Sequence, residues 1–142
     1  MTHLKTLLNN LRKQIVELHS NIRGFENQNL ESWCGIASWI VFRLLKKRGY
    51  SPKLCSNDLH AFVICDGHLI DLTLMQFHPH WFEEVYIHQT GKGHPAAEPY
   101  HLVKKSVTND TLKDLKSFFY RWPKYQKPFN IPEVEKFVNN FK

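Results

Sequence analysis

Three side chains in this sequence have the types and the chain order of a cysteine-based catalytic triad: Cys34, His60 and Asp71. A thiolate is a strong nucleophile, an imidazole can take up and return the thiol proton, and a carboxylate can orient the imidazole. The combination predicts acyl-transfer chemistry, with Cys34 as nucleophile, His60 as general base and Asp71 as the orienting group.

A β-hairpin is the element expected to bring His60 and Asp71 together. Asp66-Gly67 lies between two β-prone runs, 60–65 and 68–73, which is a strong signal for a two-residue hairpin turn. Such a turn pairs the residues that flank it, and side chains alternate along each strand. His60 and Asp71 are then diagonal neighbours on one face, whereas a register slip of one residue would put them on opposite faces.

A buried helix is expected to position Cys34. Ser32 can cap a helix over about 33–48, and Gly49 supplies the stop. The helix is apolar nearly all round until its last turn, so it should be the central buried helix. Cys34 falls in its first turn, where unpaired backbone N–H groups and the helix dipole favour the thiolate. Gly35 leaves space beside the sulfur for a substrate carbonyl.

Two segments resemble the papain-like and transglutaminase-like superfamily of cysteine enzymes: Ser-Trp-Cys34-Gly-Ile-Ala-Ser, and His60-Ala-Phe-Val-Ile-Cys-Asp-Gly-His-Leu-Ile-Asp71-Leu-Thr. The similarity covers about residues 28–77 and is nearest to compact bacterial or phage transglutaminase-like proteins and effector-type glutamine deamidases. It implies an α+β fold in which the nucleophile helix packs on an antiparallel sheet that supplies the histidine and the aspartate. It also implies an oxyanion role for Gln28, which precedes Cys34 by six residues as a glutamine does in papain-like members.

The chain of 142 residues is expected to form a single α+β domain with one core. Leucine and isoleucine recur at three- and four-residue spacing over residues 2–20, which predicts an amphipathic N-terminal helix. The sheet should hold four or five strands, including two beyond the hairpin near 84–88 and 100–104. Further helices are expected over about 109–121 and from Pro132 onward.

Composition and charge indicate which kinds of partner and which cellular location to expect. The net charge is +6, but the basic residues are spread over several segments without a recognisable nucleic-acid-binding module, so no specific nucleic-acid partner is expected. No apolar run approaches the ~20 residues that span a bilayer, and the N-terminus lacks a signal-peptide pattern. We expect a cytoplasmic location in the producing cell, with non-classical export or delivery as an effector left open. The expected partner is a protein or peptide, attacked at a peptide bond or a glutamine side chain.

Two other functions remain open from the residues alone. A catalytically silent protein-binding module on the same fold would hold a partner on its basic, aromatic surface. A metal-dependent hydrolase would use later histidines such as His78 and His80. Pro79 between them prevents the helical spacing common in zinc enzymes and no third ligand is fixed, so no metal or other cofactor is expected. Cys55 and Cys65 lack CxxC spacing and are expected to be structural.

Overall fold

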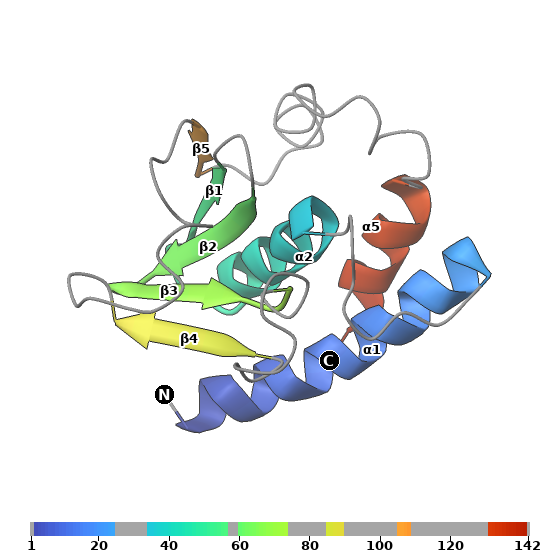
Figure 1. Ribbon diagram of the computed structural model, residues 1–142, viewed down its shortest axis with the longest axis horizontal. Helices are drawn as coiled ribbons and strands as arrows, with labels where there is room; N and C mark the ends of the chain where they lie inside the picture. The colour runs from blue at the N-terminus through green and yellow to red at the C-terminus, as the bar shows by residue number, and fades with distance from the viewer. Residues whose placement is uncertain are drawn as a thin grey trace.

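The protein is an α+β structure in which, over the described residues, three helices accompany a five-stranded antiparallel sheet (Figure 1). The computed structural model describes residues 2–24, 34–56, 60–73, 85–89, 105–108 and 131–141. The helices are α1 (Thr2–Arg23), α2 (Cys34–Lys47) and α5 (Ile131–Asn140). The strands are β1 (Lys53–Ser56), β2 (Ala61–Cys65), β3 (His68–Asp71), β4 (Tyr86–Gln89) and β5 (Lys105–Val107), in the spatial order β4-β3-β2-β1-β5. The predicted α+β class and antiparallel sheet are confirmed.

Helix α2 ends at a glycine, as the sequence predicts. Gly49 has a φ of +90°, a conformation that other residues adopt at a cost. Its N–H donates to the carbonyl of Lys46, and the N–H of Tyr50 donates to the carbonyl of Leu45, each at 3.0 Å. This pair of bonds is a Schellman motif, which satisfies the last carbonyls of the helix. The predicted cap, Ser32, lies outside the described residues.

The hairpin of β2 and β3 has the predicted two-residue turn. Asp66 and Gly67 have φ values of 51° and 73°, as a type I′ turn requires at both central positions. Cys65 pairs with His68, and the register continues through Val63 and Ile70. The pairing is therefore the one that places residues 60 and 71 on a common face, and the predicted register is confirmed.

Helix α2 runs in the same direction as β2. Near the start of the helix, the Ser38 hydroxyl donates to the carbonyl of Ala61, the first residue of β2, at 3.1 Å. About two turns later, Lys46 donates to the carbonyl of Thr108 at 2.5 Å. Strand β5 runs parallel to β2 with β1 between them, so Thr108 is level with the far part of β2. The N-terminus of α2 therefore lies at the end of the sheet where β2 begins.

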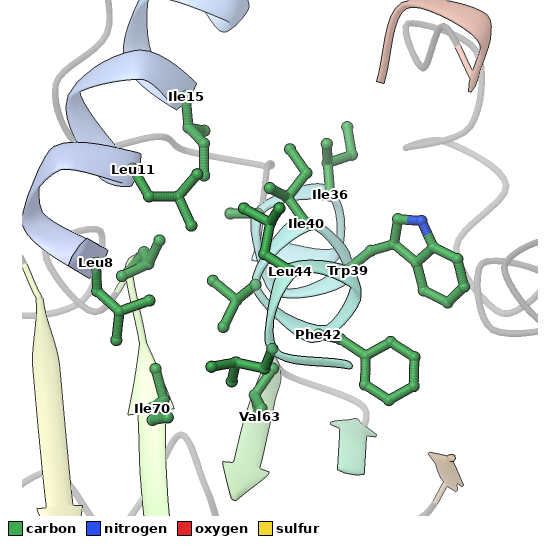
Figure 2. Close-up of a cluster of buried hydrophobic side chains, with 14 of the residues drawn as sticks. Leu8, Leu11, Ile15, Ile36, Trp39, Ile40, Phe42, Leu44, Val63 and Ile70 are labelled. Carbon is green, nitrogen blue, oxygen red and sulfur yellow. The ribbon is translucent and has the colours of Figure 1, made fainter. Parts of the chain in front are cut away.

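The two faces of the sheet belong to different clusters of buried side chains. The face towards the helices joins the main core, in which side chains from α1 and α2 meet Val63 and Ile70 (Figure 2). The opposite face carries a smaller cluster of Cys55, Phe62 and Leu69. No residue of the three described helices belongs to that smaller cluster.

Several boundaries differ from the sequence-based expectation. Helix α1 continues three residues past the predicted end at residue 20, and β4 overlaps the strand predicted near 84–88. Strand β1 was not predicted, because four residues are too few to show a periodicity and it is stabilised by pairing with β2 and β5. Strand β5 directly follows the predicted strand 100–104, which lies outside the described residues, as does the helix predicted over 109–121. Helix α5 begins beside Pro132, as expected. Within the described ranges, no helix is long and apolar enough to cross a membrane.

Candidate active site

His60 and Asp71 form a buried hydrogen-bonded pair on the face of the hairpin away from α2. The distance between His60 Nε2 and Asp71 Oδ2 is 2.5 Å, and both side chains are fully shielded from solvent. His60 immediately precedes β2 and Asp71 ends β3, so the pair stands at one end of the sheet. The contact predicted from the hairpin register is confirmed.

The Asp71 carboxylate is held from its other oxygen as well. Oδ1 accepts hydrogen bonds from the backbone N–H of Thr73 at 2.8 Å and from the Thr73 hydroxyl at 3.0 Å. A buried carboxylate is stable as an anion only when its oxygens are satisfied, and here three donors converge on it. These bonds to Oδ1 fix the orientation of the carboxylate independently of its contact with His60.

The orientation of His60 follows from the carboxylate. An ionised Asp71 accepts a hydrogen bond, so Nε2 of His60 carries the shared proton and Nδ1 is the basic nitrogen of the neutral ring. Nδ1 is itself buried. The ring stacks against Phe62, with ring centroids 6.3 Å apart and an interplanar angle of 25°. An imidazole restrained on two sides in this way can accept a proton at Nδ1 and return it from the same position.

Two helices brace the residues next to the pair. Ser38 of α2 bonds the carbonyl of Ala61, which follows His60. Arg12 of α1 donates from Nε to the carbonyl of Leu72, which follows Asp71, at 2.7 Å. The sequence-based prediction missed both residues. Each had a signal, since a polar residue on an otherwise buried helix face needs a partner inside the protein.

Cys34 is the first residue of α2, and the direction of that helix puts it at the same end of the sheet as His60. Only the backbone of Cys34 is described, and its side chain and Gln28 lie outside the described part of the chain. Gly35 and Ala37, which follow Cys34 in the first turn of α2, are small and buried. Close to this turn, the helix approaches β2 near enough for the Ser38 hydroxyl to donate to the carbonyl of Ala61. The His60 side chain lies on the face of the sheet away from α2. A side chain at the start of α2 can therefore approach it only past the end of the sheet, beside Ala61.

The remaining cysteines have a different setting. Cys55 and Cys65 are free thiols and both are buried. Burial raises the pKa of the Cys55 thiol to about 11, and the nearby positive charge of Lys53 opposes this rise. Burial, reinforced by Asp66, also raises the pKa of Cys65, which lies in the main core on the face opposite His60. Both thiols are therefore poor nucleophiles at neutral pH.

His78 and His80, the histidines considered for a metal, lie outside the described residues. The part of the chain that is described holds no group of three or more histidine, cysteine, aspartate or glutamate side chains able to bind a metal ion.

A catalytic triad is recognised by the geometry and the roles of its residues and not by their sequence positions. No protein-family model, no curated protein and no solved structure matches this chain.

Proposed function

We propose that the protein is a cysteine-dependent acyl-transfer enzyme with Cys34 as nucleophile, His60 as general base and Asp71 as the orienting carboxylate. The observation that carries the proposal is the buried His60–Asp71 pair, which stands at the end of the sheet where α2 begins. A buried histidine–carboxylate pair is weak evidence for stability, because well-packed apolar residues often serve as well or better. A chemical role therefore explains the pair better than a structural one.

The first half of the reaction is attack by the sulfur. The Cys34 thiol proton passes to Nδ1 of His60 already in the free protein, and the thiolate sulfur then forms a bond to the carbonyl carbon of an amide. Backbone N–H groups in the first turn of α2, with the positive end of the helix dipole, stabilise the thiolate and then the oxyanion. Gln28 is proposed as a further oxyanion donor. Asp71 stabilises the imidazolium through Nε2.

The second half releases the amine and then the acid. His60 returns its proton to the leaving nitrogen, the carbon–nitrogen bond breaks, and a thioester remains on Cys34. Water then attacks the thioester, the carbon–sulfur bond breaks, and the thiol is regenerated with a carboxylic acid as product. The proposed substrate is a peptide bond or a glutamine side-chain amide of another protein, and no cofactor takes part.

The pH profile of thiol alkylation tests the proposal, with mass spectrometry separating the three cysteines. An ordinary thiol with a pKa near 8.5 is about 75-fold less ionised at pH 6 than at pH 8, and its alkylation slows in proportion. We expect the alkylation rate of Cys34 to change less than about fivefold over that range, because its thiolate is held by the helix and by protonated His60. Cys55 and Cys65 should react slowly throughout, because their thiols are buried.

The variant His60→Gln should restore the steep, ordinary pH profile at Cys34. Its matched control is His68→Gln, on the same hairpin, because the His68 ring bonds the carbonyl of Asp66 at the turn and stands at the other end of the strand. A burst of nitrophenolate from an activated ester, lost in Cys34→Ser, would report the acyl-enzyme directly. An ordinary profile at Cys34 in the unaltered protein would reject the enzyme and favour a binding module.

A further inference from the structure

Ser38 links helix α2 to the strand that begins just after His60. Its hydroxyl donates to the carbonyl of Ala61, the first residue of β2, at 3.1 Å, and both residues are buried. A serine within a helix can turn its hydroxyl back to the carbonyl four residues earlier, which here belongs to Cys34. The hydroxyl of Ser38 donates to a different element instead, so this side chain ties α2 to β2.

The residues around this bond are small. Ala37 and Ala61 belong to the main core, and Gly35 is buried as well. A serine hydroxyl lies one bond beyond Cβ and a hydrogen bond spans only about 3 Å, so the bond forms only where the helix backbone comes close to the strand. The first turns of α2 therefore lie directly against the start of β2.

The bond also limits how far α2 can slide along the strand. Side chains of α2 share the main core with Val63 and Ile70, and this burial holds the helix against the sheet (Figure 2). Hydrophobic burial has no direction, so it opposes a small slide of the helix less than it opposes separation. A hydrogen bond depends on both distance and angle and weakens steeply away from its best geometry. The bond from Ser38 to Ala61 therefore sets the level of α2 along β2.

This level brings the backbone of Cys34 beside that of His60. A helix rises about 1.5 Å per residue, so Cys34 lies about 6 Å before Ser38 along α2. A strand rises about 3.3 Å per residue, so His60 lies about 3 Å before Ala61 along β2, which runs in the same direction as the helix. Helix side chains lean towards the N-terminus, so the carbonyl bound by Ser38 is itself displaced in that direction. Residues 34 and 60 then stand at about the same level.

We infer that Ser38 is a positioning residue for the proposed triad: its bond to Ala61 holds the first turn of α2, and with it the backbone of Cys34, level with His60. A slide of the helix by one residue would move Cys34 by about 1.5 Å. Misplacement of a catalytic group by about 1 Å can cost on the order of 100-fold in rate. The catalytic part of this inference rests on the proposed function, and the structural part does not.

Two substitutions at position 38 test the hydroxyl. Ser38→Ala removes it and leaves a residue that helices favour, whereas Ser38→Thr keeps a hydroxyl donor. The matched control is Lys46→Met, because Lys46 also donates from α2 to a backbone carbonyl, that of Thr108 after β5. This side chain is exposed and lies about two turns beyond Ser38. The control therefore loses a bond of α2 far from the turn that carries Cys34.

The structural readout is amide hydrogen exchange along α2, which depends on no catalytic role. In a helix that begins at Cys34, the amides of residues 38 and 39 bond the first two carbonyls and report whether the first turn is closed. We expect Ser38→Ala to speed exchange at these two amides about fivefold more than at residues 42–45. Ser38→Thr and Lys46→Met should keep the ratio of the unaltered protein. Equal acceleration along the whole helix in Ser38→Ala would overturn the structural part of the inference.

The kinetic readout is the alkylation rate of Cys34 at pH 6 relative to that at pH 9, where an ordinary thiol is largely ionised. We expect this ratio to fall about tenfold in Ser38→Ala and to change less than about threefold in Ser38→Thr and Lys46→Met. An unchanged ratio in Ser38→Ala would overturn the catalytic part of the inference. A tenfold fall in a folded Ser38→Thr would also overturn it, and this arm decides the matter if Ser38→Ala does not fold.

The two readouts separate failure of the inference from failure of the proposed function. If Cys34 of the unaltered protein has the ratio of an ordinary thiol, the proposed function fails and the catalytic part of the inference fails with it. The exchange experiment still decides whether Ser38 holds the first turn of α2. If the unaltered protein has the expected reactivity and Ser38→Ala keeps it, the proposed function stands and the positioning role of Ser38 is rejected.

Discussion

Replacement of Asp71 by asparagine removes one charge from the core and changes almost no volume. From the described residues, the carboxylate accepts three hydrogen bonds, one from His60 and two from Thr73. The amide oxygen of asparagine can still accept the two bonds from Thr73, but these bonds are then between neutral groups. The amide NH₂ group is a donor that faces another donor, the Nε2–H of His60. A bond to a charged group contributes about 1.5–3 kcal/mol and a neutral one about 1 kcal/mol. A loss of about 1 kcal/mol at each of three bonds predicts a destabilisation of about 3 kcal/mol.

Urea denaturation of Asp71→Asn measures that cost, and Asp66→Asn is its matched control. Asp66 undergoes the same chemical change on the same hairpin, but it is exposed and lies in a turn where asparagine is equally well accommodated. We expect the control to stay within about 0.5 kcal/mol of the unaltered protein. If Asp71→Asn is no less stable than Asp66→Asn, the carboxylate is not the anchor of the buried network.

The same substitution should reverse the histidine tautomer. With an amide NH₂ facing it, Nε2 of His60 must accept a hydrogen bond, so the ring proton moves to Nδ1 and the base is lost. We expect nitrogen chemical shifts of His60 to report the exchange of tautomers, and turnover of an activated ester to fall by roughly 10²- to 10⁴-fold. Unchanged turnover in a folded Asp71→Asn would refute an orienting role for Asp71.

Three further predictions concern the elements that hold the site. Ser38→Ala should cost about 1–2 kcal/mol in urea denaturation, because it leaves the buried carbonyl of Ala61 without this donor, and a cost near zero would show that the carbonyl is satisfied otherwise. Gly49→Ala should cost about 1 kcal/mol, because an added Cβ meets no atom within 4 Å and only the positive φ opposes it; a neutral result would contradict that backbone argument. Burial raises the pKa of the Cys55 thiol to about 11 in the folded protein, above that of an exposed thiol. Between about pH 9 and 11 the unfolded chain therefore loses a proton that the folded chain retains, and the free energy of unfolding falls as the pH rises. Cys55→Ala should show a smaller fall over that window, and an identical fall would assign it to other groups.

The local elements were predictable because their signals are local. Asp66-Gly67 specified the turn, the turn specified the register, and the register led to the contact between His60 and Asp71. Gly49 likewise marked the end of α2 through a backbone conformation that glycine favours. In each case the energetic cause lies within a few residues of its sequence signal.

The features that the sequence did not predict depend on contacts between residues that are distant in the sequence. Strand β1 exists because β2 and β5 flank it, and nothing in its own four residues distinguishes it from a loop. Arg12 could be recognised as a polar residue on a buried helix face, but its partner Leu72 is apolar and contributes only a carbonyl. The direction of α2 against the sheet, which brings Cys34 to the His60 end, rests on contacts from Ser38 and Lys46 that no periodicity reveals.

The short span of the His60–Asp71 contact has a consequence for the order of folding. Its two residues are separated by 11 positions and close within a single hairpin, whereas the contact between Arg12 and Leu72 must close a loop of 60. Short loops lose less chain entropy on closure, so we expect the hairpin to form before α1 docks and before β5 joins β1. Native-state hydrogen exchange should then find the amides of β2 and β3 better protected than those of β5, and the reverse ranking would contradict this sequence of events. On this view the hairpin that carries the proposed acid–base pair forms early, and α1 then packs against a unit that has already formed.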